Sequence, residues 1–161
     1  MAGSKWTGDL TTGRAAMLEV LARALFEEEV EKFSAELLES RSWIVFAKDY
    51  PTLEVGFSAN DGARLRVRLL CDEWNDRPPS VELRDWQGSP LTSIERDPAS
   101  VFNNSPHPAT RKPFICMKGV REYHTHPSHI NDPWDAIKAG NRFNLGGILT
   151  QIWHVWRSLH K

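Results

Sequence analysis

The N-terminal part of the chain carries a long helical pattern. Between residues 14 and 39, apolar side chains recur every three to five positions, and Glu and Lys fill most of the positions between them. Neither Gly nor Pro interrupts this stretch. The spacing predicts one amphipathic packing helix over residues 14–39 with a solvated acidic face. Its predicted core positions are Leu18, Leu21, Leu25, Val30, Phe33 and Leu37.

The pattern then changes to a period of two, which is typical of half-buried strands. The predicted strands cover residues 43–47, 53–58, 64–70 and 81–86. The Asn-Asp-Gly sequence at 60–62 is a hairpin signal, and Pro78 and Pro79 break the chain before the fourth strand. The alternating arginines at 64, 66 and 68 are interpreted as the wet face of a sheet. We therefore predict an α+β fold in which a four-stranded antiparallel meander follows the first helix.

The second half of the chain is mostly irregular until its end. Residues 87–113 are rich in Gly, Ser, Asn and Pro, and a long loop of this kind in a small domain is usually functional or disordered. A short apolar run covers 114–117, and helical spacing returns at 144–159 with Asn144 as its N-cap. We predict a single domain over residues 1–161, with residues 1–12 flexible.

Composition and charge narrow the classes of function. The chain has 161 residues, 40% hydrophobic and 25% charged, with a formal net charge of -1. This balance argues against a strongly basic nucleic-acid-binding protein. No apolar stretch approaches the roughly 20 residues that span a bilayer, and the N-terminus shows no signal peptide. We expect a cytoplasmic protein without nucleic-acid or membrane partners.

The candidate chemistry gathers around one cysteine. Four of the six histidines, at positions 107, 124, 126 and 129, fall on either side of Cys116. A thiol can hold an acyl group as a thioester, and a neighbouring imidazole can assist it, so Cys116 is the candidate nucleophile with His124 and His126 as its helpers. Cys71 continues an alternating strand and is expected to be a small buried side chain.

The same segment also suggests a metal site. Cys116, Glu122, His124 and His126 are all zinc-ligand types. In a strand, residues two apart point to the same face, but the Cα atoms of residues 122 and 126 would lie roughly 13 Å apart. The four side chains would meet on one ion only if the segment bent.

Asp132, in an Asp-Pro-Trp sequence, is a third candidate. A loop carboxylate near a thiol can accept a proton from an attacking amine. The alternative is an Asp that shapes a turn or caps a helix, which is the commoner role.

The order of these parts resembles the ubiquitin-conjugating enzyme family. That family has a long first helix, a four-stranded meander, a Pro-Pro before a strand, a His-Pro pair, an Ile-Cys, a Trp and a Leu-rich final helix. Here the corresponding short motifs are Pro78-Pro79, His107-Pro108, Ile115-Cys116 and Trp134. The resemblance covers nearly the whole chain and implies a ubiquitin-conjugating fold.

The resemblance also implies roles for individual residues. Cys116 matches the thioester cysteine, and His107-Pro108 matches the start of a His-Pro-Asn sequence whose His is structural. Ala109 stands where that family has the Asn that stabilises an oxyanion. The segment between Cys116 and Trp134 is longer than in common members. Replacement donors are expected among Asn103, Asn104, His124 and His126.

The spacing of Cys116, Glu122, His124 and His126 is also similar to a bacterial domain named for its Cys-Glu-His-His order and predicted to bind metal. Such domains neighbour ubiquitin-like proteins, ThiF-type activating enzymes and JAB-type peptidases in bacterial operons, some of them implicated in antiphage defence. The resemblance implies a ubiquitin-like protein, a ThiF-type activating enzyme and a target protein as partners.

Three hypotheses follow. In the first, Cys116 carries a ubiquitin-like protein as a thioester and passes it to a target, with Asp132 handling the acceptor amine and without any cofactor. In the second, the chain is a zinc-binding module. In the third, it is an inactive relative of the conjugating fold that only binds partners. The expected surface position of Cys116 favours the first.

Overall fold

The computed structural model describes residues 10–161, with side chains from Leu18 onward. The prediction of a flexible N-terminus therefore lies outside the described residues for 1–9, whereas residues 10–12 belong to the first helix. The helices are α1 (Leu10–Glu31), α2 (Ala35–Arg41), α3 (Arg121–His124) and α4 (Leu145–Leu159), with 3₁₀ turns η1 (Pro127–His129) and η2 (Trp134–Ala136). The strands are β1 (Trp43–Asp49), β2 (Thr52–Ser58), β3 (Arg64–Leu70), β4 (Ser80–Arg84), β5 (Phe102–Asn103) and β6 (Phe114–Ile115).

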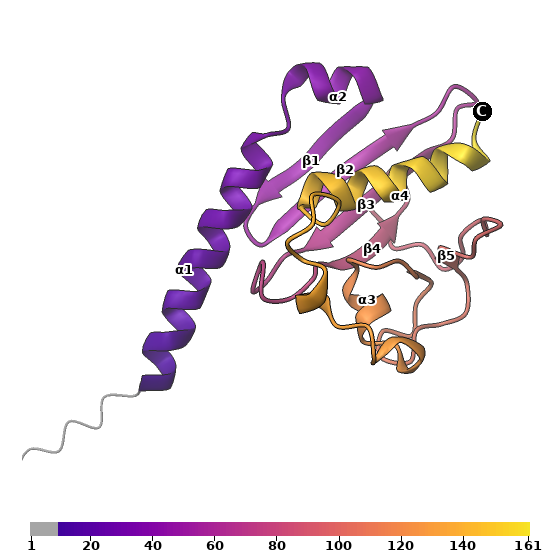
Figure 1. Ribbon diagram of the computed structural model, residues 1–161. Coiled ribbons are helices and arrows are strands. Elements are labelled where there is room, and N and C mark those ends of the chain that lie inside the picture. The colour runs from indigo at the N-terminus through magenta and orange to yellow at the C-terminus, as the bar shows by residue number, and fades with distance from the viewer. Residues whose placement is uncertain (1–9) are drawn as a thin grey trace, which may run out of the picture.

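The main sheet is an antiparallel meander in the order β1-β2-β3-β4, which confirms the predicted α+β architecture (Figure 1). The hairpin between β2 and β3 closes where the sequence indicates, because the N–H of Ala59 donates to the carbonyl of Ala63 and Gly62 adopts a φ of +88°. The fourth strand is shorter than predicted. It ends at Arg84 because the side chain of Asp85 accepts hydrogen bonds from Gln87 and Ser89 and turns the chain.

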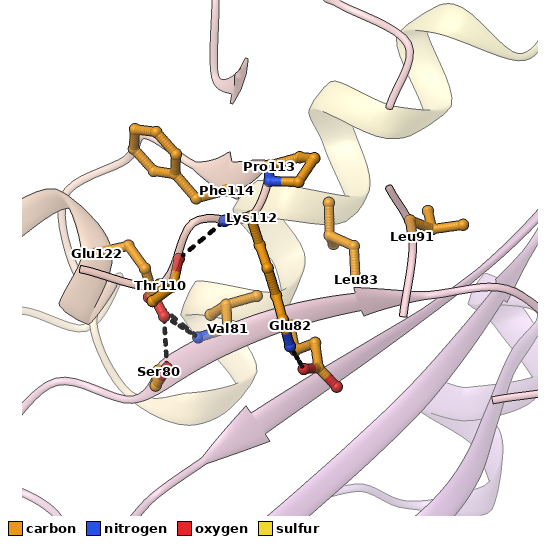
Figure 2. A pocket seen from close by; sticks show the side chains of 10 residues that line it. All are labelled: Ser80, Val81, Glu82, Leu83, Leu91, Thr110, Lys112, Pro113, Phe114 and Glu122. Carbon is orange, nitrogen blue, oxygen red and sulfur yellow. Dashed lines mark hydrogen bonds and ion pairs between the residues drawn. The ribbon is translucent and has the colours of Figure 1, made fainter. Parts of the chain in front are cut away.

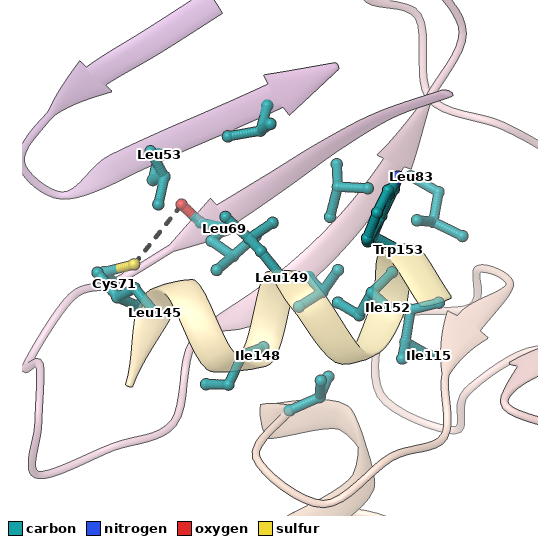
Figure 3. Close-up of a cluster of buried hydrophobic side chains, with 14 of the residues drawn as sticks. Leu53, Leu69, Cys71, Leu83, Ile115, Leu145, Ile148, Leu149, Ile152 and Trp153 are labelled. Carbon is teal, nitrogen blue, oxygen red and sulfur yellow. Dashed lines mark hydrogen bonds between the residues drawn. The ribbon is translucent and has the colours of Figure 1, made fainter. Parts of the chain in front are cut away.

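Helix α4 covers one face of this sheet, and the core lies between them (Figure 3). The side chains of Ile148, Leu149 and Ile152 are fully buried there, each stabilising the fold by about 1.5–3 kcal/mol relative to exposure. Asn144 caps the helix as predicted, because its Oδ1 accepts from the N–H of Gly147 at 2.7 Å. Cys71 is fully buried in the same core, as expected.

The prediction of one helix over 14–39 is wrong in two respects. The helix breaks after Glu31, because Ser34 caps a second helix by accepting from the N–H of Leu37. The buried face also differs in part: Ala22 and Phe26 are buried, and among the predicted core positions Val30 is confirmed as buried. Three predicted core positions are instead exposed, namely Leu18, Leu21 and Leu25. In Figure 1 the N-terminal part of α1 extends away from the sheet.

Glu29 ties the C-terminal half of α1 to the rest of the fold. Its carboxylate accepts from the indole N–H of Trp74 at 3.2 Å and from the backbone N–H of Leu145 at 2.7 Å. Burial raises the pKa of this carboxyl group. Leu145 is the first residue of α4, so one side chain joins the two helices at the edge of the core.

The sheet face opposite α4 is polar and aromatic. Arg66 pairs with the buried Glu54 at 2.6 Å, and its own side chain is only 16% exposed. The interpretation of the β3 arginines as a wet face therefore holds for the exposed Arg64 and not for Arg66. Phe46 and Trp86 meet edge to face above Gly56, where an added Cβ would lie within 2.6 Å of both rings. Among residues 10–161, no helix combines the length and apolar character needed to cross a membrane.

Candidate functional site

The small β5–β6 ladder positions Cys116. Phe102 pairs with Ile115, and both side chains are buried toward the core. The pairing continues by one residue, because the N–H of Cys116 donates to the carbonyl of Val101 at 2.7 Å. Since side chains alternate along a strand, Cys116 points away from the core, and it is half-buried. The thiol therefore lies near the surface and is partly accessible to solvent.

The imidazole that reaches the thiol is that of His129. Its Nε2 lies 3.7 Å from the Sγ of Cys116. The ring lies flat against Tyr123, with centroids 3.9 Å apart and planes 14° from parallel. His129 belongs to the histidine cluster but was not assigned a role from sequence. The signal for it is Pro127, which favours the start of a helical turn and so brings the residue two positions later back toward the strand.

Partial burial sets the state of the thiol. It raises the pKa of Cys116, so the sulfur carries its proton at neutral pH. The resting site therefore does not activate the thiol by lowering its pKa. A proton must leave when the sulfur attacks, and the Nε2 of His129 is placed to accept it.

The ring of His124, a predicted helper of the thiol, faces the backbone. Its Nδ1–H donates to the carbonyl of Asp132 at 2.8 Å, and its Nε2 accepts from the N–H of Gly119 at 3.0 Å. Both ring nitrogens are therefore used by the backbone. Burial lowers the pKa of His124, which keeps the ring neutral. In this structure the ring joins the turn after Cys116 to the loop before η2, and the predicted catalytic role of His124 stays a prediction.

His126 supports the turn that carries His129. Its Nδ1 accepts from the N–H of Ser128 at 3.2 Å and so caps η1. Its ring stacks on Phe114 with centroids 5.8 Å apart, and lies 5.9 Å from the ring of His129. His126 therefore borders the thiol site without contacting the sulfur in the way that His129 does.

Asp132 is not a helix cap, because η2 begins after Pro133 and Asp132 makes no capping bond. Its Oδ2 accepts from the hydroxyl of Tyr123 at 2.8 Å and pairs with the Nζ of Lys118 at 3.1 Å. These two contacts, the tyrosine first, hold the pKa of Asp132 below its usual value. Burial and this carboxylate together raise the pKa of Tyr123 to about 12. The carboxylate therefore faces the amine of a lysine in the same chain, and its role toward an acceptor amine stays a prediction.

His107 has the structural role that the resemblance implies. Its ring is 1% exposed, its Nε2–H donates to the carbonyl of Glu122 at 2.9 Å, and its Nδ1 accepts from the N–H of Ala109 at 3.1 Å. The ring therefore fixes the loop after it against α3.

The residues of the zinc alternative are not brought together. The segment expected to be a strand at 122–126 is the short helix α3 and the turn after it, so His124 and His126 do not share a strand face. Glu122 is buried, and its carboxylate binds the hydroxyl of Ser80 and the N–H of Val81 (Figure 2). Among residues 10–161, no three His, Cys, Asp or Glu side chains form a metal-binding group.

A cavity of about 210 Å³ lies beside this region, at the outer edge of β4 (Figure 2). Phe114 and Glu122 line it from the side of the candidate site. The ion pair between Lys112 and Glu82, 2.7 Å long, crosses it. The cavity contains neither Cys116 nor His129, so we assign it no part in the chemistry.

Two of the four expected oxyanion donors are already engaged. Asn104 uses both its oxygen and its nitrogen on the backbone of Ile94. His124 presents an accepting nitrogen to Gly119 and so has no free N–H there. Asn103 pairs with Phe114 in the ladder and therefore shares the face of Cys116, and its Oδ1 accepts from Ser105. The amide nitrogen of Asn103 remains as a donor on that face.

Comparisons with known proteins fall on this part of the chain. Residues 99–157 match the model of the Y4jH-like family, described as the Y4jH family. This segment includes Cys116, the four surrounding histidines and Asp132. The chain is also similar to the uncharacterized protein y4jH of Sinorhizobium fredii, with 46% identity over 41 residues. That match covers 26% of this chain and 20% of the relative, so it spans about a fifth of the relative's length.

Proposed function

We propose that the chain is a ubiquitin-conjugating-like transferase that carries a ubiquitin-like protein as a thioester on Cys116. The observation that carries the proposal is the half-buried sulfur of Cys116 at 3.7 Å from the Nε2 of His129. A cysteine thiol with an imidazole base beside it is suited to acyl exchange. The order of helix, meander, Cys116 loop and final helix also favours the ubiquitin-conjugating fold.

Acyl exchange between thiols changes little free energy, because one thioester replaces another. The sulfur of Cys116 attacks the carbonyl carbon of the incoming thioester and passes its proton to His129. The C–S bond to the donor breaks, and the donor sulfur leaves as a thiol after it takes that proton from His129. The site must therefore supply a base and a donor for the oxyanion. His129 provides the base. We assign the donor to the amide of Asn103, and the loss of one such donor typically costs ~10²–10³ in rate.

The partners follow from this chemistry and from the resemblance. A ThiF-type activating enzyme would deliver the ubiquitin-like protein, and a target protein would receive it. A bacterial conjugation pathway of the kind linked to antiphage defence is the setting we propose. The zinc alternative receives less support, because the carboxylate of Glu122 is buried against β4 and His124 is held by the backbone.

The proposal is tested with the cognate ubiquitin-like protein, its activating enzyme and ATP. Wild-type chain is expected to form an adduct that a reducing thiol removes. In Cys116→Ser the adduct becomes an oxyester that resists thiol and is cleaved by hydroxide. Cys71→Ala serves as the matched control and should behave as wild type.

The absence of any adduct that depends on Cys116 would overturn the transferase. Biological activity that survives Cys116→Ala would favour the inactive, partner-binding alternative. Purified protein that holds roughly one zinc per chain, lost in His124→Ala and His126→Ala, would favour the metal module.

A further inference from the structure

One lysine amine of the chain is held beside the candidate site. Lys118 lies two residues after Cys116, and its Nζ is 3.1 Å from the Oδ2 of Asp132. Asp132 is the carboxylate to which a role in receiving an acceptor amine was assigned from sequence. Its Oδ2 also accepts from the hydroxyl of Tyr123, whose ring lies against His129. A continuous set of contacts therefore runs from the lysine amine to the thiol.

The lysine is within reach of an acyl group on the sulfur. Two residues of chain span at most ~7 Å between Cα atoms. The N–H of Val120 donates to the carbonyl of Met117, so Lys118 sits inside a turn that keeps it near the strand end. Its side chain is 52% exposed and can swing on its four-carbon stem from Asp132 toward the thioester carbonyl.

We propose that Lys118 is an internal acceptor, so that the acyl group first held on Cys116 moves to the Nζ of Lys118. This inference rests on the proposed function, because it requires an acyl group on the sulfur. The ammonium of Lys118 gives one proton to water, and its nitrogen attacks the thioester carbonyl carbon. A C–N bond forms and the C–S bond breaks. The second proton of the nitrogen ends on the sulfur of Cys116, which leaves an isopeptide and a free thiol.

Lys112 is also an exposed, ion-paired lysine, but we do not expect it to accept the acyl group. Its side chain is 49% exposed and pairs with Glu82 at 2.7 Å, so its exposure and pairing match those of Lys118. It lies four residues before Cys116 and crosses the cavity at the edge of β4. Its carboxylate partner makes no contact with Tyr123, whereas that of Lys118 does. Lys112→Arg is therefore a matched control.

The test uses the full chain and a short peptide that ends in Gly-Gly and is activated as a small-molecule thioester. This probe loads a reactive thiol without an activating enzyme. Intact mass is followed over time with and without a reducing thiol, and the modified residue is mapped by proteolysis. In wild type and Lys112→Arg, a thiol-labile adduct on Cys116 should convert into a thiol-resistant adduct on Lys118. In Lys118→Arg the adduct should stay thiol-labile, and in Cys116→Ala acylation of Lys118 should be lost.

The outcomes separate this inference from the proposed function. An adduct that forms on Cys116 but persists as long in wild type as in Lys118→Arg overturns the internal acceptor and leaves the acyl carrier intact. A resistant adduct on another lysine, or equal acylation of Lys118 in Cys116→Ala, also overturns it. Absence of any adduct on Cys116 contradicts the proposed function and the inference together.

Discussion

The two cysteines of the chain occupy opposite kinds of environment. Cys71 is fully buried beside α4, and its Sγ donates to the carbonyl of Leu69 at 3.9 Å. Cys116 is half-buried and faces the Nε2 of His129 at 3.7 Å. Burial raises the pKa of both thiols. What distinguishes the two is therefore the presence of a group that can take the proton, since neither thiol is activated by a lowered pKa.

The surroundings of the two cysteines are also held by different forces. Around Cys71 the sheet and α4 pack apolar side chains that the sequence periodicity places correctly. Around Cys116 the chain is irregular, and imidazole rings hold it: His107 binds the backbone of α3, and His124 binds the turns on both sides of it. His107 and His124 thus serve here as structural residues, whereas the ring of His129 lies beside the thiol.

The largest expected effect separates the two thiols directly. Cys116→Ala should abolish loading by the Gly-Gly peptide thioester, because the other cysteine, Cys71, is fully buried. Cys71→Ala should load at the wild-type rate and lower the free energy of unfolding by about 1 kcal/mol, as for the loss of one methylene-sized group. Loading is read by intact mass and stability by chemical denaturation. Loading that survives Cys116→Ala and disappears in Cys71→Ala would reverse the comparison.

The next effect concerns the base. His129→Gln should lower the initial rate of Cys116 loading by ~10²-fold, the lower end of what a positioned general base supplies. His154→Gln changes an exposed histidine on α4 and is the matched control, which should leave the rate unchanged. The rates come from time courses of intact mass. Equal rates in His129→Gln and wild type would remove His129 from the chemistry.

A third prediction concerns the region of Cys71 and its stability. Glu29→Ala removes the acceptor of Trp74 and of the first N–H of α4, and should lower the free energy of unfolding by ~2–3 kcal/mol. Glu27→Ala removes an exposed carboxylate two residues before Glu29 and should have little effect on stability. Both are measured by urea unfolding. Comparable stability of the two variants would show that Glu29 does not tie α1 to α4.

The smallest effect is the pH response of the Cys116 region. Folding lowers the pKa of His124, so the folded state binds this proton less readily than the unfolded state does. The stabilisation is therefore complete above about pH 6.5, the usual value for the free side chain, and is lost as the pH falls below it. Because Nε2 accepts from Gly119, the hydrogen-exchange protection of the Gly119 amide should fall over the same range. Protection of Gly119 that is constant with pH would contradict this.

The sequence predicts the sheet and α4 well because both obey a simple period. The alternation in β3 and the Asn144 cap each mark an element whose bounds the structure reproduces closely. It predicts α1 poorly, since Leu18, Leu21 and Leu25 have the spacing of a buried face but are exposed. Periodicity indicates which face is apolar, and the tertiary fold decides whether anything covers it.

The candidate site shows a similar limit. Cys116 and the histidine cluster are visible in the sequence, but the ring that reaches the sulfur depends on whether residues 121–129 form a strand or helical turns. Alternation in a strand pairs His124 with His126, whereas α3 and η1 send His124 to the backbone and bring His129 to the thiol. In a segment this short, the sequence pattern fits a strand as well as a helical turn, and the tertiary contacts decide between them.

The most direct measurement is the site of the first acyl group on the wild-type chain after brief exposure to the Gly-Gly peptide thioester. We expect proteolytic mapping at the earliest time to find a thiol-labile acyl group on Cys116 and an unmodified Cys71. An early acyl group on Cys71, or none on Cys116 while free lysines are already modified, would contradict the claim that Cys116 is the acyl carrier.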